Sequence, residues 1–142
     1  MLVRLALSSA SFIAADLRGA HLEGSDLVDA HLEGAYLDSV HLEDADLRGA
    51  HLEGADLSHS HLEGAYLEGA HLEGVYLEGA HLEGARLTRA SLDGDTLLNG
   101  ARYDDDTEFA HPWHALTEAE RETARQPWRD RGLIHVSEVQ GD

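Results

Sequence analysis

Histidine and glutamate recur together at a fixed spacing through the middle of this chain. The triplet His-Leu-Glu opens at seven positions ten residues apart, namely His21, His31, His41, His51, His61, His71 and His81. Imidazole nitrogens and carboxylate oxygens are ligands for zinc, nickel and copper. Histidine also changes charge near pH 6.5, so the eleven histidines would move the net charge from -18 to -7 on acidification. A metal-binding array, a pH-responsive surface and a solvated face in which each glutamate offsets a histidine are the three alternatives.

The charge balance excludes several classes of partner. The chain has 28 acidic and 10 basic residues, all of the latter arginine, and a net charge of -18. Direct binding to nucleic acid or to an anionic membrane needs a basic surface, so neither is expected. The absence of cysteine excludes disulfides and thiolate metal sites, and the sequence indicates no cofactor.

A five-residue period decides how these side chains are positioned. Every fifth residue from position 2 to 97 is leucine, except Phe12, and the residue two places earlier is small from Ala10 to Ala90. Five residues advance an α-helix by about 500° and a strand by an odd number, so neither element would gather the leucines on one side. If the chain turns a corner in every group of five, all leucines point to a common interior, as in a solenoid.

The groups of five resemble the pentapeptide-repeat family. Ala15-Asp16-Leu17-Arg18-Gly19, Ala45-Asp46-Leu47-Arg48-Gly49 and Ala55-Asp56-Leu57-Ser58-His59 match its motif of a small residue, Asp or Asn, Leu or Phe, and two variable positions. The resemblance implies an all-β solenoid over residues 1–103. This would be a right-handed quadrilateral β-helix of about five coils, with roughly 4.8 Å between hydrogen-bonded strands.

With four groups per coil, residues twenty apart should stack in ladders on the surface. The long histidine ladder is His21, His41, His61 and His81, and the short histidine ladder on the opposite side is His31, His51 and His71, each beside its glutamates. The Asp16 ladder (Asp16, Tyr36, Asp56 and Tyr76) and the Asp26 ladder (Asp26, Asp46, Tyr66 and Arg86) occupy the other two faces.

The remaining residues, 104–142, form a tail that is expected to cap the open end of the solenoid. The register slips by one after Asp95, with Leu98 and Tyr103 as the new inward residues. Thr117 and Glu120 form a capping-box pattern that predicts a helix over about 117–126, ended by Pro127. The residues expected to cap the solenoid, or to form a homodimer as caps do in the resembled family, are Phe109, Trp113, Leu116, Trp128, Leu133 and Ile134.

The pattern favours a non-catalytic protein-interaction scaffold with an acidic surface. Its interior is filled with leucine, and its carboxylates repeat in equivalent environments, whereas catalysis needs unlike groups that converge on one point. The resemblance implies an alternative, because similar family members that confer quinolone resistance are DNA mimics that bind DNA gyrase and topoisomerase IV, modulate these enzymes and protect them from inhibitors. Asp16, Asp26, Asp46 and Asp56 match the acidic motif position and are the candidate binding residues. Leu7 and Phe12 follow the repeat, so a cytoplasmic location is expected rather than a secretory signal.

Overall fold

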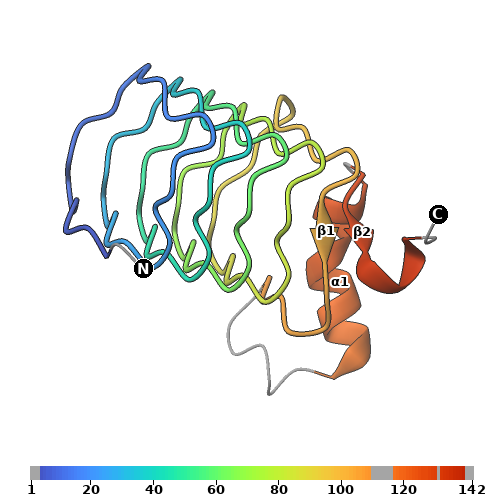
Figure 1. The fold of residues 1–142 in the computed structure, drawn as a ribbon. Coiled ribbons are helices and arrows are strands. Elements are labelled where there is room, and N and C mark those ends of the chain that lie inside the picture. Colours follow the sequence, from blue (N-terminus) through green and yellow to red (C-terminus); the bar gives the residue numbers. More distant parts are fainter. Residues whose placement is uncertain (1–3, 110–116, 131, 140–142) are drawn as a thin grey trace.

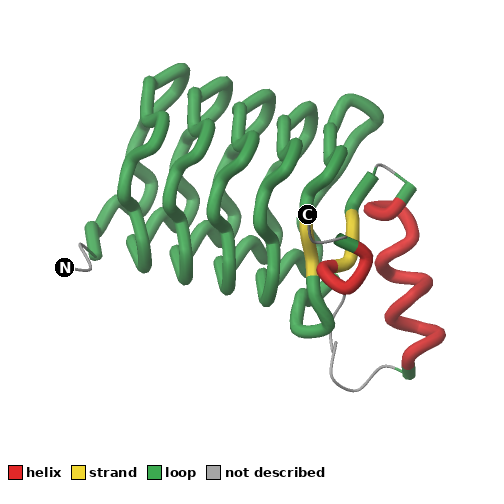
Figure 2. Tube along the Cα trace, turned by 45° about the vertical axis from the view of Figure 1, so that its right-hand side comes forward, coloured by secondary structure: helices red, strands yellow, loops and turns green. Residues whose placement is uncertain are grey.

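The chain winds into a stack of coils that is closed at one end by a small C-terminal cap (Figure 1). This computed structural model describes residues 4–109, 117–130 and 132–139. A turn follows each group of five residues, and single-residue bridges link positions twenty apart, as in His21↔His41 and Asp26↔Asp46. Four turns therefore complete one coil, and Figure 2 shows the coils side by side along one axis. Among the described residues, no helix is long and apolar enough to cross a bilayer.

Backbone hydrogen bonds between successive coils hold the stack together. His41 N–H donates to the carbonyl of Ala20 at 2.9 Å in the coil before, and Leu42 N–H donates to the carbonyl of His61 at 2.8 Å in the coil after. The same pair of bonds recurs from group to group along the solenoid. Because this register fixes residue i above residue i+20, it places like outward residues in columns.

Each corner of a coil needs a residue with left-handed backbone conformation, two places after the inward leucine. Glycine fills this place in six of the seven His-Leu-Glu units; Gly64, for example, has φ 69°. Asp44 replaces glycine in the remaining unit, which opens at His41, and keeps the conformation, with φ 55°. Aspartate is one of the few residues with a side chain that tolerate this region, so the corner survives the substitution.

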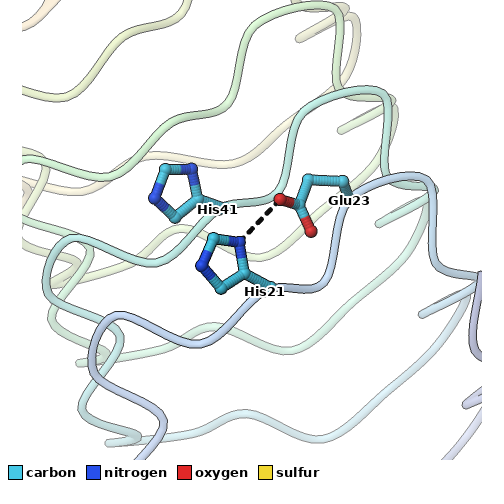
Figure 3. A group of neighbouring side chains, drawn as sticks. All are labelled: His21, Glu23 and His41. Carbon is cyan, nitrogen blue, oxygen red and sulfur yellow. Dashed lines mark hydrogen bonds and ion pairs between the residues drawn. The ribbon is translucent and has the colours of Figure 1, made fainter. Parts of the chain in front are cut away.

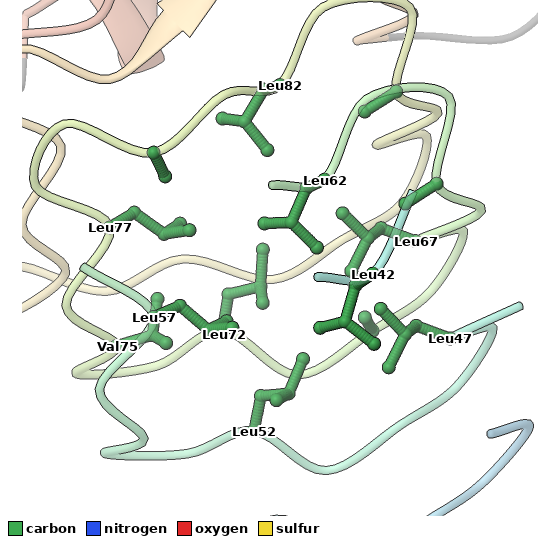
Figure 4. Packing of buried hydrophobic residues seen from close by; sticks show 14 of the residues in the cluster. Leu42, Leu47, Leu52, Leu57, Leu62, Leu67, Leu72, Val75, Leu77 and Leu82 are labelled. Carbon is green, nitrogen blue, oxygen red and sulfur yellow. The ribbon is translucent and has the colours of Figure 1, made fainter. Parts of the chain in front are cut away.

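The core is a column of leucines and small residues inside the coils (Figure 4). Leu42, Leu52 and Leu62 are at most 1% exposed, and the small residues such as Ala45 and Val40 are fully buried. The small side chains leave room for the leucines of neighbouring coils to meet. This arrangement confirms the prediction that the five-residue period turns the leucines inward, since those of the period from Leu22 to Leu87 are all buried.

Two longer turns shift the register near the C-terminal end of the stack. Asp93–Thr96 adds one residue, so Tyr76 pairs with Leu97, and Leu98 replaces it as the buried residue at 0% exposure. A second longer turn, over 104–107, follows buried Tyr103, and Arg86 then pairs with Glu108. Only the first shift was predicted. The Asp-x-Asp-Thr pattern shared by 93–96 and 104–107 is the sequence signal that reveals the second.

The cap consists of α1 (Glu118–Arg129), a short 3-10 helix (Val136–Glu138), and strand β2 (Ile134–His135), which pairs in parallel with β1 (Arg102–Tyr103). Strand β2 thus continues the ladder of the last coil. The Thr117–Glu120 capping box is present, as predicted.

Pro127 does not end α1, contrary to the expectation that the helix stops at about residue 126. The helix continues to Arg129 because Trp128, which is 5% exposed, packs its ring against Phe109 with ring centroids 5.5 Å apart. Phe109 and Leu133 are also buried, and Ile134 is half-buried. Trp113 and Leu116 lie outside the described residues.

Candidate functional site

The histidines of each ladder stack face to face on the outside of the solenoid. The rings of His21 and His41 are 4.5 Å apart between centroids and 8° from parallel. Figure 3 shows these two rings beside Glu23. His41 and His61 stack at 4.7 Å, and His61 and His81 at 5.0 Å. In the short ladder, His51 stacks on His31 at 4.7 Å and on His71 at 4.6 Å. The spacing of the rings follows the spacing of the hydrogen-bonded backbone.

Each histidine also contacts the glutamate two residues later. The Nδ1 atom lies 2.7 Å from a carboxylate oxygen in the His21–Glu23 pair and 2.8 Å in the His31–Glu33 pair. The hydrogen bond from its histidine lowers the pKa of Glu23, and Glu33 is affected in the same way. In the sequence each of these histidines is followed two residues later by a glutamate, but only the folded chain shows that the two side chains meet.

The glutamates keep one carboxylate oxygen that has no protein partner. The Oε2 atom is buried and accepts no hydrogen bond from the described part of the chain in Glu33, Glu43, Glu53, Glu63, Glu68, Glu73 and Glu83. A buried oxygen of a carboxylate without a donor is costly. A cation or a hydrogen-bond donor placed next to these oxygens would therefore stabilise them.

Two histidines and the intervening glutamate form a compact set of ligand atoms at five places. The sets are His21–Glu23–His41, His31–Glu33–His51, His41–Glu43–His61, His51–Glu53–His71 and His61–Glu63–His81. In each set, the ligand atoms lie within 4.8 Å of one another. The last set is notable because one glutamate oxygen faces both rings: Glu63 Oε1 is 3.2 Å from His61 Nδ1 and 3.7 Å from His81 Nδ1.

The four candidate aspartates have a structural role that the sequence did not reveal. Asp16, Asp26, Asp46 and Asp56 each accept a hydrogen bond from the backbone N–H two residues later, at distances from 3.0 Å for Asp56 to 3.4 Å for Asp16. Such bonds satisfy a backbone donor in the turn. The motif position therefore selects aspartate partly for the fold itself.

Arginines neutralise two of these four aspartates. Arg18 lies 2.7 Å from Asp16, and Arg48 lies 2.6 Å from Asp46. The hydrogen bond from Arg18 lowers the pKa of Asp16 to about 2, and Arg48 likewise lowers the pKa of Asp46. These carboxylates are ionised but already paired, so their charge is less available to a partner.

Tyrosines distinguish the two aspartate ladders. On the Asp16 ladder, Tyr36 is 54% exposed and Tyr76 is 44% exposed. On the Asp26 ladder, the guanidinium of Arg86 covers the ring of Tyr66 at 4.9 Å from its centroid. The Asp16 ladder thus presents open aromatic surface, whereas the aromatic ring of the Asp26 ladder is engaged within the chain.

Comparison with known proteins identifies the repeat. A family model described as pentapeptide repeats matches in eight copies, over residues 7–44, 25–64, 35–74 and 65–94. A search of curated proteins found no match.

Solved structures with similarity to this chain are also pentapeptide-repeat or resistance proteins by their descriptions. A pentapeptide repeat protein from the cyanobacterium Cyanothece 51142 matches with 31% identity and a TM-score of 0.57, over 70% of this chain and 63% of its own. The match therefore spans less than two thirds of that relative. A pentapeptide repeat protein of the Arabidopsis thaliana thylakoid lumen matches with 25% identity and a TM-score of 0.46, over 97% of this chain and 83% of its own. QnrB1, a plasmid-mediated fluoroquinolone resistance protein, matches with 21% identity and a TM-score of 0.34, over 70% of this chain and 62% of its own.

Proposed function

We propose, from the premise that this chain belongs to the pentapeptide-repeat family, that it is a non-catalytic interaction module that binds a cationic protein segment. The binding surface is the Asp16 ladder: Asp16, Tyr36, Asp56 and Tyr76. The leucine-filled interior supports a binding role, because it leaves the chemistry to the outer faces of the coils. The observation that carries the proposal is the exposure of two tyrosines on a strongly acidic chain.

The chemistry of this face suits arginine or lysine side chains. Tyrosine is enriched among the residues that dominate binding energy at interfaces, and its ring attracts guanidinium and ammonium groups. Asp38 and Glu78 follow Tyr36 and Tyr76 by two residues, the spacing at which Arg18 contacts Asp16. Each tyrosine is thus followed, two residues later, by a residue with a carboxylate. A basic segment can place its cations on the rings and its hydrogen-bond donors on the carboxylates.

The Asp26 ladder is less suited to the same partner. One aspartate on each ladder is paired with an arginine, Asp16 with Arg18 and Asp46 with Arg48, so the ladders differ at their tyrosines. Arg86 lies over Tyr66, and a basic partner would have to displace it, whereas Tyr36 and Tyr76 are exposed. Tyr66 therefore provides a matched control for Tyr36 and Tyr76.

A nine-residue arginine peptide is a direct probe of this surface. We expect its binding, followed by NMR, to shift the backbone resonances of Tyr36 and Tyr76. The double substitution Tyr36→Ala and Tyr76→Ala should weaken binding at least about fivefold, through the loss of two cation–π contacts. Tyr66→Ala should leave the affinity unchanged. Equal affinities of the double variant and the parent, or shifts confined to the histidine ladders, would refute the assignment of this face.

A second candidate is DNA mimicry directed at DNA gyrase or topoisomerase IV. It is supported by outward carboxylates that recur at one-coil intervals on a chain of net charge -18. DNA-binding clefts attract such a charge pattern, and the attraction should weaken steeply with salt. The pairing of Asp16 and Asp46 with arginines leaves Asp26 and Asp56 as the first residues to test.

A gyrase supercoiling assay separates the two candidates. It is run with and without a quinolone, in chelator and at two salt concentrations. Inhibition or drug protection that falls with salt, and that is lost in the double variant Asp26→Asn and Asp56→Asn, supports mimicry. A folded sample without effect at micromolar concentration contradicts it and leaves the cationic protein segment as the partner class.

Two further expectations stay predictions. Homodimerisation through the tail would use apolar side chains left on the surface of the cap, such as Val136 and Val139, which are 37% and 36% exposed. Light scattering at several concentrations tests it. The cytoplasmic location is tested by fractionation of the source cells.

A further inference from the structure

We propose that the histidine ladders bind divalent transition cations of the zinc and nickel type, a role separate from the interaction surface above. Each ion is held by two histidines one coil apart and by the glutamate that lies between them. Two imidazoles and one carboxylate are a donor set that proteins use for zinc, with further positions open to water. The ladders lie on the sides of the solenoid adjoining the Asp16 ladder, so the two roles need no common residue.

The His61–Glu63–His81 set is closest to a formed site. A tetrahedral ion with bonds of about 2.0–2.1 Å needs its ligand atoms about 3.4 Å apart. Glu63 Oε1 lies 3.2 Å from His61 Nδ1 and 3.7 Å from His81 Nδ1. The first distance is slightly shorter and the second slightly longer than the required value. The ion would replace the Nδ1 proton that the carboxylate now accepts.

The two rings must turn to complete the site. The rings of His61 and His81 are 5.0 Å apart between centroids and 16° from parallel, and each Nδ1 lone pair lies in the plane of its ring, so both rings have to turn toward Glu63 before they converge on one ion. Their side chains are 36% and 27% exposed, so they can turn about their side-chain bonds without moving the backbone. The backbone spacing is fixed by the bridge between the same two residues.

The glutamates of four of these sets share a second feature, which Glu68 beside the Asp26 ladder also has. The Oε2 atom of Glu63 is buried and accepts no hydrogen bond from the described residues, and Glu33, Glu43 and Glu53 are alike in this respect. A cation at the adjacent oxygen would compensate this buried negative charge. A cation can bind there without a change of fold, because the carboxylate already lies at the site.

Neighbouring sets on a ladder share a histidine, and this limits the number of ions that one chain can bind without shared ligands. The long ladder has four histidines and therefore holds two sets with no residue in common, His21–Glu23–His41 and His61–Glu63–His81. The short ladder has three histidines and holds one set. Three ions per chain can thus bind without shared ligands, and one histidine of the short ladder is left over.

Isothermal titration of the untagged full chain with zinc chloride tests this count. The triple variant His41→Asn, His51→Asn and His61→Asn breaks all five sets while it leaves four ladder histidines. It therefore serves as the baseline for zinc bound elsewhere, including the tail. We expect the parent to bind three more ions than this variant. His51→Asn should lose one ion, and the double variant His41→Asn and His61→Asn should lose two. His59→Asn, outside the ladders, should lose none.

A second pair of variants tests the role of the carboxylate. Glu63→Gln should weaken the site with His61 and His81 at least about tenfold, because a neutral amide replaces a charged ligand. Glu68→Gln is the matched control: Glu68 holds the same place in its group and has the same buried Oε2, but Tyr66 stands where a histidine would be. It should leave zinc binding unchanged.

NMR of the parent protein gives a readout that does not depend on variants. Zinc should shift the imidazole resonances of His61 and His81 before that of His59. The proposal fails if the triple variant binds as many ions as the parent. It also fails if His59→Asn and His51→Asn lose the same number, or if zinc shifts all histidines alike, which would mean adventitious surface binding only. Melting curves in chelator establish that each variant is folded.

Discussion

A residue's place within its group of five decides whether it fills the core, accepts a hydrogen bond from the backbone or faces solvent. The inward leucines and the small residues two places earlier are buried, and the aspartates before the leucines accept backbone N–H groups. Histidine and tyrosine at that same outward place stack on the residue twenty positions away or remain open to solvent. Substitutions at neighbouring positions should therefore differ sharply in their effect.

Leu97 and Leu98 show this difference within one pair. Leu98 is 0% exposed, whereas Leu97, which keeps the five-residue count, lies 36% exposed above Tyr76. We expect Leu98→Ala to lower the free energy of unfolding by about 2–5 kcal/mol, because it leaves a cavity in the core. Leu97→Ala should lower it by less than about 1 kcal/mol. Urea denaturation of both variants measures the contrast, and equal losses would contradict the register described above.

Two buried serines should respond to alanine in opposite directions. Ser60 is fully buried and its hydroxyl has no hydrogen-bond partner among the described residues, whereas Ser25 accepts the N–H of Leu5 at 3.2 Å. We expect Ser60→Ala to raise the free energy of unfolding by about 1 kcal/mol, because it removes an unsatisfied polar group. Ser25→Ala should lower it by about the same amount. Thermal or urea unfolding checks both, and destabilisation by Ser60→Ala would indicate an unseen partner.

At the scale of elements, two longer turns and a helix adapt the last coils to the cap. The turns at 93–96 and 104–107 share one design. Their first aspartates accept the N–H of Gly74 and of Gly84, both at 2.8 Å. The hydroxyls of Thr96 and Thr107 donate to the carbonyls of Leu72 and Leu82. Each turn therefore replaces the backbone bonds that its extra residue interrupts.

The first of these turns should make stability depend on acid pH. The backbone N–H of Gly74, aided by the donors of Thr96 and Asp95, lowers the pKa of Asp93 below its usual 3.8. A carboxylate with a lowered pKa stabilises the folded state above its unfolded value, and the contribution is lost as pH falls through the folded value. We expect the free energy of unfolding to fall less steeply below about pH 4 in Asp93→Asn than in the parent.

Urea unfolding at several pH values between about 3 and 6 measures this slope. The asparagine can still accept the N–H of Gly74 through its amide oxygen, so the turn is kept. Asp95→Asn is the control, because Asp95 enters the turn as a backbone donor rather than as the acceptor. Parallel slopes for the parent and Asp93→Asn would contradict the role given to this carboxylate.

At the scale of the whole molecule, the solenoid is a one-dimensional stack in which each coil touches only its neighbours. Bridges join residues twenty apart through the regular part of the chain, so every coil presents the same pairing surface to the next. In such architectures, stability is close to a sum of coil and interface contributions. Whole coils should therefore be removable, while fractions of a group should not.

Two deletions test this modularity. Removal of residues 41–60 joins Val40 to His61 with the register intact, so we expect a folded protein with cooperative but less stable unfolding. Removal of residues 41–58 joins Val40 to His59 and turns the following leucines out of phase. That protein should lose its cooperative transition. Circular dichroism during heating compares the two, and equal cooperativity would contradict the stacked-coil register.

The sequence by itself determined the inward leucines and the start of α1, because these follow from a period and a capping pattern that are local in the chain. The stacking of residues twenty apart followed from the resemblance to the pentapeptide-repeat family rather than from the period. The tertiary structure decided which outward residues meet. It showed the stacked imidazoles, the glutamate oxygen between His61 and His81, and the pairing of Asp16 and Asp46 with arginines. These contacts depend on the hydrogen-bonded distance between coils and on side-chain torsions, which a period does not encode.

The end of α1 in the cap also depends on a contact that the sequence does not predict. The local effect of Pro127 predicted that the helix ends at about residue 126. The helix instead extends to Arg129, because Trp128 packs against Phe109. Phe109 lies nineteen positions before Trp128 in the chain, so no local pattern records their contact. Periodicity determines which side of a coil a residue faces, and only the folded packing determines what it touches there.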